Sequence, residues 1–108
     1  MCAKKEMNRE QIERFYTSKR WKRKREIILR RDRYQCQLSK RYGKTEAAEV
    51  VHHIFPVEGY PQYALVNWNL ISLSRARHNT LHDRTTNKLT REGIDLMTRT
   101  AREQKIKL

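Results

Sequence analysis

The chain has 108 residues, enough for one domain with a modest core and not for two. It carries 25 Lys and Arg against 12 Asp and Glu, and the net charge of +13 predicts a polyanionic partner, with nucleic acid the first candidate. An anionic membrane surface is the rival, but no apolar run approaches the ~20 residues of a spanning helix, and no secretory signal opens the sequence. Cys2 and Cys36 are too few for a disulfide framework, so we expect a reducing, cytoplasmic setting.

Two helices are predicted near the N-terminus, after a disordered stretch over residues 1–8. Asn8 is a candidate N-cap for a helix over residues 9–16, and Ser18 is a candidate N-cap for a second helix that ends near Arg31. Each helix has an apolar stripe that we expect to pack inward. The stripes are Ile12, Phe15 and Tyr16 in the first helix, and Trp21, Ile27, Ile28 and Leu29 in the second.

The rest of the second helix is almost entirely basic. Like charges at helical spacing repel one another, and backbone phosphates would offset that cost without reading base sequence. A merely solvated face, or a helix that only supports the core, is the alternative. The candidate nucleic-acid-binding residues here are Lys19, Arg20, Lys22, Arg23 and Lys24.

All four histidines fall between residues 52 and 82. Residues 47–51, which end in two β-branched valines, predict a strand, and Pro56 ends it, which places His52 and His53 near the strand end. Residues 57–68 are broken at Gly59 and Pro61, and we expect one helical turn after Pro61. We assign the aromatic residues of this stretch to the core. A second strand is predicted over residues 69–73.

A third helix is predicted over residues 74–84, capped by Ser74. On such a helix His78 and His82 are four residues apart and project from one face. Two imidazoles facing a third at a strand end can form three corners of a metal site, although an isolated His-x-x-x-His pair is more often exposed or hydrogen-bonded. A last helix, capped by Thr90, is predicted to bury Ile94, Met97 and Ala101.

The order His52-His53, Asn69-Leu70, His78 and His82 resembles the HNH endonucleases, and especially colicin-type nuclease domains. The resemblance covers about residues 15–84 and implies an α+β fold with a ββα-metal, treble-clef-like core between N- and C-terminal helices. We therefore expect a single nuclease domain over 1–108, with an extension at 1–17, the core at 18–84 and a C-terminal helix at 85–108. The small size is similar to that of stand-alone phage or prophage members.

The resemblance also implies roles for individual residues. His52, His78 and His82 would ligate one divalent cation, His53 would be the general base, and Asn69 would hold the loop and ring of that base. Many members have Asp in place of the first histidine, so the all-histidine set makes a simple magnesium preference doubtful, and zinc, nickel, manganese and magnesium are all candidates. Asp83 is a candidate for orienting a ligand ring, and Arg75, Arg77 and Arg84 are candidate phosphate contacts.

Many HNH proteins also carry a zinc knuckle made of two Cys-x-x-Cys pairs. The corresponding positions here are Cys36, Ser39, Ser74 and Arg77, which supply one thiolate, so we expect no structural zinc. The shape of the knuckle is expected to persist through packing of Tyr34, Leu38 and Tyr42.

The predicted function is metal-assisted hydrolysis of DNA phosphodiester bonds. A non-catalytic DNA-binding or phage packaging accessory protein is the alternative from another class, and a ribonuclease is the alternative enzyme. Charge does not discriminate among them, but cleavage assays with a divalent metal and both polymers would.

Overall fold

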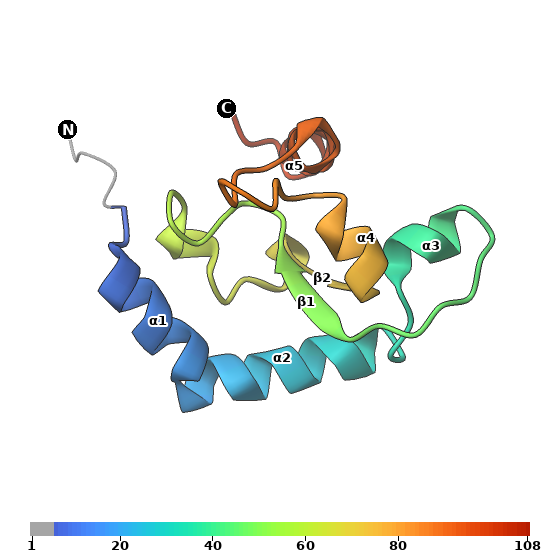
Figure 1. The fold of residues 1–108 in the computed structure, drawn as a ribbon, viewed down its shortest axis with the longest axis horizontal. Coiled ribbons are helices and arrows are strands. Elements are labelled where there is room, and N and C mark those ends of the chain that lie inside the picture. The colour runs from blue at the N-terminus through green and yellow to red at the C-terminus, as the bar shows by residue number, and fades with distance from the viewer. Residues whose placement is uncertain (1–5) are drawn as a thin grey trace.

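A short antiparallel sheet lies at the centre of the computed structural model, which describes residues 6–108 (Figure 1). Its strands are β1, Val50–His53, and β2, Leu70–Leu73, with His52 opposite Ile71 and His53 opposite Leu70. The predicted first strand therefore begins later than expected and includes both histidines. Because successive side chains of a strand point to opposite faces, His52 and His53 lie on different sides of the sheet.

The two N-terminal helices follow the predicted caps. Helix α1 spans Arg9–Thr17 behind a capping box at Asn8, and α2 spans Lys19–Arg31 behind Ser18. The sequence predicts disorder over residues 1–8, of which residues 1–5 lie outside the described part. The prediction is wrong for residues 6–8, because the Met7 amide donates to the Glu58 carbonyl at 2.9 Å and Asn8 caps α1.

The inward stripes of these helices are only partly as predicted. Every residue of α1 is described, and none is buried: Phe15 is half-buried, whereas Tyr16 is 43% exposed. In α2 the stripe is correct for Trp21, Ile28 and Leu29, which are buried, but Ile27 is 49% exposed. Helix α1 therefore lies over the body rather than within it.

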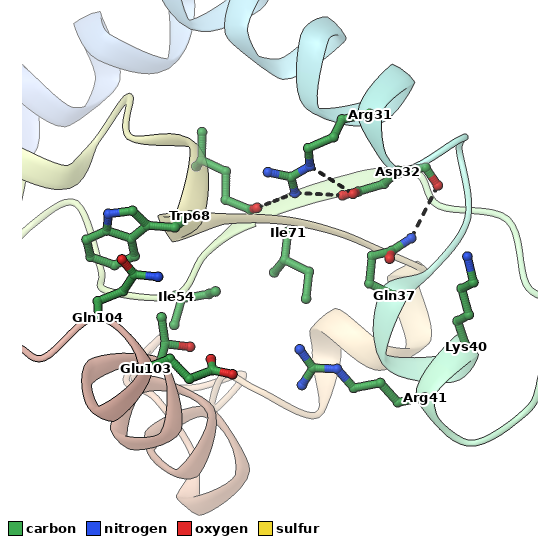
Figure 2. Close-up of a pocket in the computed structure, with 12 residues that line it drawn as sticks. Arg31, Asp32, Gln37, Lys40, Arg41, Ile54, Trp68, Ile71, Glu103 and Gln104 are labelled. Atoms are coloured by element: carbon green, nitrogen blue, oxygen red, sulfur yellow. Dashed lines mark hydrogen bonds and ion pairs between the residues drawn. The ribbon is translucent and has the colours of Figure 1, made fainter.

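The end of α2 is fastened to β2 by Arg31 and Asp32, which lie side by side in Figure 2. The Arg31 guanidinium donates to the Asp32 carboxylate at 2.9 and 3.0 Å and to the Leu70 carbonyl at 2.7 Å. Asp32 in turn accepts from the Ser72 amide at 3.0 Å. A side cavity of about 370 Å³ opens beside this network, and no histidine lines it among the described residues.

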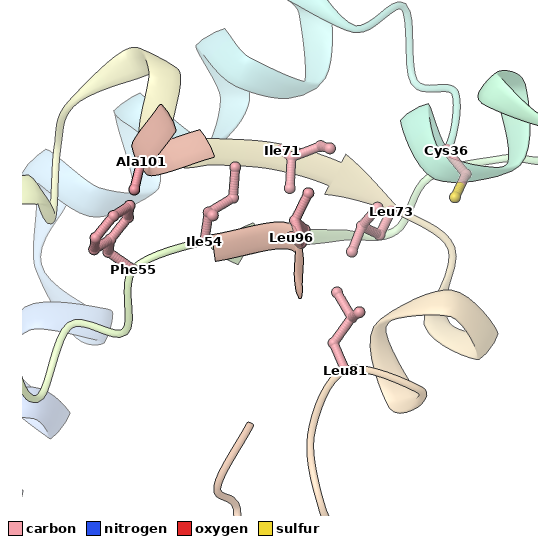
Figure 3. Packing of buried hydrophobic residues seen from close by; sticks show 8 residues of the cluster. All are labelled: Cys36, Ile54, Phe55, Ile71, Leu73, Leu81, Leu96 and Ala101. Atoms are coloured by element: carbon pink, nitrogen blue, oxygen red, sulfur yellow. The ribbon is translucent and has the colours of Figure 1, made fainter. Parts of the chain in front are cut away.

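The core has one cluster on each face of the sheet. On the α2 face Trp21, Ile28 and Leu29 pack with Val51 and Leu70. The other face is covered by α4 and α5, and Figure 3 shows its cluster. That cluster consists of Cys36, Ile54, Phe55, Ile71, Leu73, Leu81, Leu96 and Ala101.

The segment at the expected knuckle is short and polar inside. Helix α3, Gln37–Arg41, begins after Cys36, whose buried thiol accepts from the Ser39 hydroxyl at 3.3 Å; Ser39 also bonds to Glu46. Burial raises the pKa of the Cys36 thiol, but hydrogen bonds from Ser39 and Ser74 outweigh it and lower that pKa overall. The predicted packing of Tyr34 and Tyr42 is wrong, because they are 45% and 71% exposed.

The connection between the strands is tied down by two single-turn 3₁₀ helices, Pro61–Tyr63 and Asn67–Asn69. The first confirms the turn predicted after the proline. Tyr60, Tyr63 and Trp68 surround Phe55, with ring centroids 5.0 to 5.7 Å from it, so the aromatic residues of this loop belong to the core as predicted.

The helix predicted over 74–84 is wrong beyond its first turn and a half. Helix α4 spans only Arg75–Asn79, behind the expected Ser74 cap. Its continuation is blocked because Thr90 bonds to the carbonyls that follow: the Thr90 hydroxyl donates to Thr80 at 2.6 Å and the Thr90 amide donates to Leu81 at 2.9 Å. His82 instead pairs with Leu89 in an isolated β-bridge.

Helix α5, Arg91–Glu103, has the predicted Thr90 cap but is rotated from the predicted stripe. Leu96, Thr100 and Ala101 are buried, Met97 is half-buried, and Ile94 is 46% exposed. Within residues 6–108, no helix combines the length and apolar character needed to cross a membrane.

Gly93 allows α5 to approach the chain that carries His82. A Cβ at Gly93 would lie 2.5 Å from the Leu81 carbonyl oxygen and 2.9 Å from a Leu89 methyl group. We therefore predict that Gly93→Ala destabilises the fold by about 1–3 kcal/mol, although Gly→Ala in an unobstructed helix stabilises by ~1 kcal/mol. Urea unfolding measures the change. Gly59→Ala is the control, since nothing lies within 4 Å of its Cβ position; equal stability of the two variants would contradict this close approach.

Candidate functional site

A cleft of about 920 Å³ runs along the edge of β1 that does not pair with β2. All four residues of β1 line it, and no residue of β2 does, both strands lying wholly in the described part. Tyr16 of α1 closes one side, and His78 of α4 and His82 close the other. The cleft therefore reaches both faces of the sheet at its edge.

Three imidazoles meet on the α4 side of this cleft. His52, His78 and His82 each offer one ring nitrogen, and these three atoms lie within 4.8 Å of one another. The ring centroids are 5.3 Å apart for His52 and His78, 5.1 Å for His52 and His82, and 5.0 Å for His78 and His82. Although α4 ends early, His82 still lies beside His52 and His78 as predicted. It is held there by a β-bridge rather than by a helix.

The surroundings of the three rings suit metal binding. His52 is 1% exposed, and neither of its ring nitrogens has a hydrogen-bond partner among the described residues, a costly arrangement that a bound cation would relieve at one of them. Nδ1 of His82 lies 3.2 Å from the Asn87 carbonyl; donating there would leave Nε2 free as a ligand atom. Nitrogen ligands of a zinc-like ion lie ~3.4 Å apart, so small ring movements would complete the site.

Burial keeps the rings of His52 and His78 neutral, the form that binds metals. Desolvation lowers the pKa of His52 well below its usual range, with further lowering by the charges of His78 and His82. Desolvation also lowers the pKa of His78, helped by His82 and Arg75. His52 and His78 therefore present lone pairs rather than protons to the cleft.

Asp83 does not orient a ligand ring. Its carboxylate accepts from the amides of Thr85 and Thr86 at 2.8 and 3.0 Å, and these bonds lower the pKa of this exposed group. It shapes the turn that returns the chain to Leu89. The carbonyl of Asn87, within that turn, has the place beside His82 that we expected the carboxylate to take.

His53 lies on the opposite face of the sheet from the three clustered rings. Its ring stacks on Trp21 with centroids 4.7 Å apart, and Phe15 and Tyr16 pack edge-on at 5.8 Å. Nε2 lies 2.9 Å from the Ala64 carbonyl, so it carries the proton and donates it there, which leaves Nδ1 as an acceptor. Burial lowers the pKa of His53 to about 4, against a raising effect of the Ala64 bond.

Asn69 supports the loop that holds His53 rather than the ring itself. Its amide oxygen accepts from the Phe55 amide at 2.7 Å, and its amide nitrogen donates to the carbonyls of Phe55 and Tyr63 at 3.1 Å each. The sequence predicts that Asn69 holds the ring as well as the loop, but its side-chain hydrogen bonds go to the loop backbone. Asn69 instead fixes the residue next to Ala64, whose carbonyl orients His53.

The basic residues predicted to bind nucleic acid surround the body but do not line the cleft; this holds for all eight, which lie within the described part. Some have partners in the fold: Lys24 donates to Asn67 at 2.8 Å, Arg75 lies 3.5 Å from Glu49, and Arg77 lies over the Tyr42 ring. The remaining members are exposed. They are Lys19, Arg20, Lys22, Arg23 and Arg84.

Two antiparallel strands and a following helix, with imidazoles gathered between them, define the ββα-metal class of fold. Scans of protein-family models and of curated proteins each give no match. Among solved structures, the chain is similar to the HNH endonuclease of the deep-sea thermophilic bacteriophage GVE2, solved with a manganese ion. The match has a TM-score of 0.64 and 37% sequence identity, and covers 65% of this chain and 76% of that one. The chain belongs to the HNH endonuclease family.

Sequence reasoning missed several residues of this site. The Ala64 and Asn87 carbonyls are backbone groups, and no side-chain pattern indicates them. Trp21 and Tyr16 were assigned only to apolar stripes, yet they contact His53. These contacts depend on the bend between α1 and α2, which the spacing of Tyr16 and Trp21 in the sequence does not indicate.

Stability of the metal-free protein should fall as the pH falls from 7 to 5. The pKa of His53 is about 4 in the fold and ~6.5 in the unfolded chain, so the unfolded chain binds more protons between these values. Stability is thus complete above pH ~6.5 and declines toward pH 4, with His53 contributing about 2 kcal/mol of loss by pH 5. Urea unfolding in chelator measures it. His53→Gln should show a smaller decline, and an identical decline in both proteins would contradict the buried neutral ring.

Proposed function

We propose that the chain is a metal-dependent endonuclease that hydrolyses DNA phosphodiester bonds. The observation that carries this proposal is the division of four histidines along one cleft. Three rings cluster with lone pairs available for a cation, while the fourth is held separately with its Nδ1 as an acceptor. A cation beside an uncoordinated base is the pairing that metal-assisted hydrolysis requires.

His52, His78 and His82 would hold one divalent cation. When bound, such an ion supplies positive charge that stabilises the charged phosphate oxygens and the departing oxygen. An imidazole binds a metal in its neutral form, so the full charge of the ion would face the substrate. All-nitrogen donors suit zinc or nickel better than manganese or magnesium, which prefer oxygen ligands.

His53 would act as the general base. With Nε2–H bonded to Ala64, the Nδ1 lone pair takes a proton from water as the water oxygen forms a bond to phosphorus. The opposite P–O bond breaks, and the departing oxygen takes a proton from solvent. The lowered pKa keeps His53 neutral at pH 7, so no proton must leave the ring before reaction. Asn69 keeps the Ala64 carbonyl in place through the loop.

The basic exterior would hold the DNA backbone. The exposed side of α2 carries Lys19, Arg20, Lys22 and Arg23. Arg84 is also exposed and lies two residues after His82. These charges would contact phosphates and weaken binding as salt rises. Arg75, Arg77 and Lys24 remain candidates, but each would have to leave its present partner to bind a phosphate.

We predict that the protein nicks or cuts supercoiled plasmid in the presence of manganese, nickel, zinc or magnesium, and that chelator stops it. His53→Ala should lower the cleavage rate at least about 100-fold, because the proton acceptor is lost. Its metal affinity, measured by calorimetric titration with nickel, should stay close to that of the unmodified chain.

His78→Ala is the matched control, since it should weaken nickel binding as well as cleavage. Full cleavage by His53→Ala would refute the base assignment. Metal-dependent DNA binding without cleavage by the unmodified chain would support the accessory role instead, and cleavage of RNA alone would identify a ribonuclease.

A further inference from the structure

Helix α1 brings a phenol to the nitrogen that would accept the water proton. The Tyr16 hydroxyl lies 3.4 Å from His53 Nδ1, and both residues line the cleft. The other ring nitrogen is already bonded to Ala64, so Tyr16 is the side chain placed on the free lone pair. This contact joins residues 37 positions apart, and neither was predicted to touch the other.

The contact is too long to be a strong direct hydrogen bond. O–H donors usually lie ~2.8 Å from their acceptors, so at 3.4 Å the phenol resists displacement only weakly. One water bonded to both groups would separate them by about 4.5 Å, an opening of about 1 Å. Tyr16 is 43% exposed on a helix that buries no residue, so this movement would uncover no buried residue of α1.

We propose that Tyr16 is a positioning residue for the attacking water. This inference rests on the proposed function. In it, the water donates one hydrogen to His53 Nδ1 and the other to the phenol oxygen. With both hydrogens engaged, its lone pairs point away from the two side chains, toward a phosphate in the cleft. The proton passes to His53 alone, the new bond is water oxygen to phosphorus, and Tyr16 remains neutral throughout.

The stacked rings around His53 favour positioning over a simple cover. Trp21 lies face to face with His53, and Phe15 packs against both Trp21 and Tyr16 at 5.3 Å. This cluster fixes the direction of Nδ1 and places the Tyr16 ring edge-on, with its hydroxyl beside the lone pair rather than its ring across it. Burial raises the pKa of Tyr16, so the hydroxyl keeps its proton.

The test is Tyr16→Phe, which removes the hydroxyl and keeps the ring. With supercoiled plasmid and manganese under single-turnover conditions, the rate at saturating protein should fall about tenfold, as expected for one lost hydrogen bond. The protein concentration for half-maximal rate should change less than about twofold. In the metal-free protein, the ¹⁵N resonance of His53 Nδ1 should move while that of Nε2 stays in place.

Tyr34→Phe is the matched control, because Tyr34 is 45% exposed and its hydroxyl bonds to Glu26, away from the cleft. It should leave both rate and resonances unchanged. An unchanged or faster rate for Tyr16→Phe, or an equal loss for Tyr34→Phe, would overturn the positioning role while leaving His53 as the base. If the unmodified chain cuts no plasmid, the proposed nuclease function and this inference fail together.

Discussion

The alternation of side chains along β1 is the constraint on which the site depends. His52 and His53 are neighbours in sequence, but the pleat sends one ring to each face of the sheet. The His52 ring has no hydrogen-bond partner among the described residues, which leaves it available to a ligand. The His53 ring, on the other face, is stacked and hydrogen-bonded. A shift of one residue in the pairing with β2 would exchange the two environments. The Arg31 and Asp32 network, which bonds to both Leu70 and Ser72, opposes such a shift.

A backbone carbonyl lies beside one histidine on each side of the sheet. The Ala64 carbonyl fixes the proton of His53, and the Asn87 carbonyl lies beside Nδ1 of His82. Each carbonyl belongs to a loop held by one polar side chain, Asn69 in the first case and Asp83 in the second. The hydrogen bonds of these two side chains therefore set where the carbonyls lie beside the rings.

Local chemistry predicted much of the fold, because helix caps are read from single residues. Asn8, Ser18, Ser74 and Thr90 each cap the helix assigned to them, and the histidine order indicated the strands and helix around a metal. Prediction failed where tertiary contacts decide. Thr90 also bonds to the carbonyls after α4 and ends that helix early. The same holds for exposure: periodicity identifies a stripe but not how much of it another element covers, as the exposed rings and side chains of α1 and α5 show.

The measurement that tests the division of the histidines most directly is X-ray absorption spectroscopy of the nickel-bound protein, which counts imidazole ligands. We expect three imidazoles in the unmodified chain, three in a variant that lacks the ring of residue 53, and fewer in a variant that lacks the ring of residue 52. Loss of a ligand when the ring of residue 53 is removed, or no loss when the ring of residue 52 is removed, would contradict this division of the histidines.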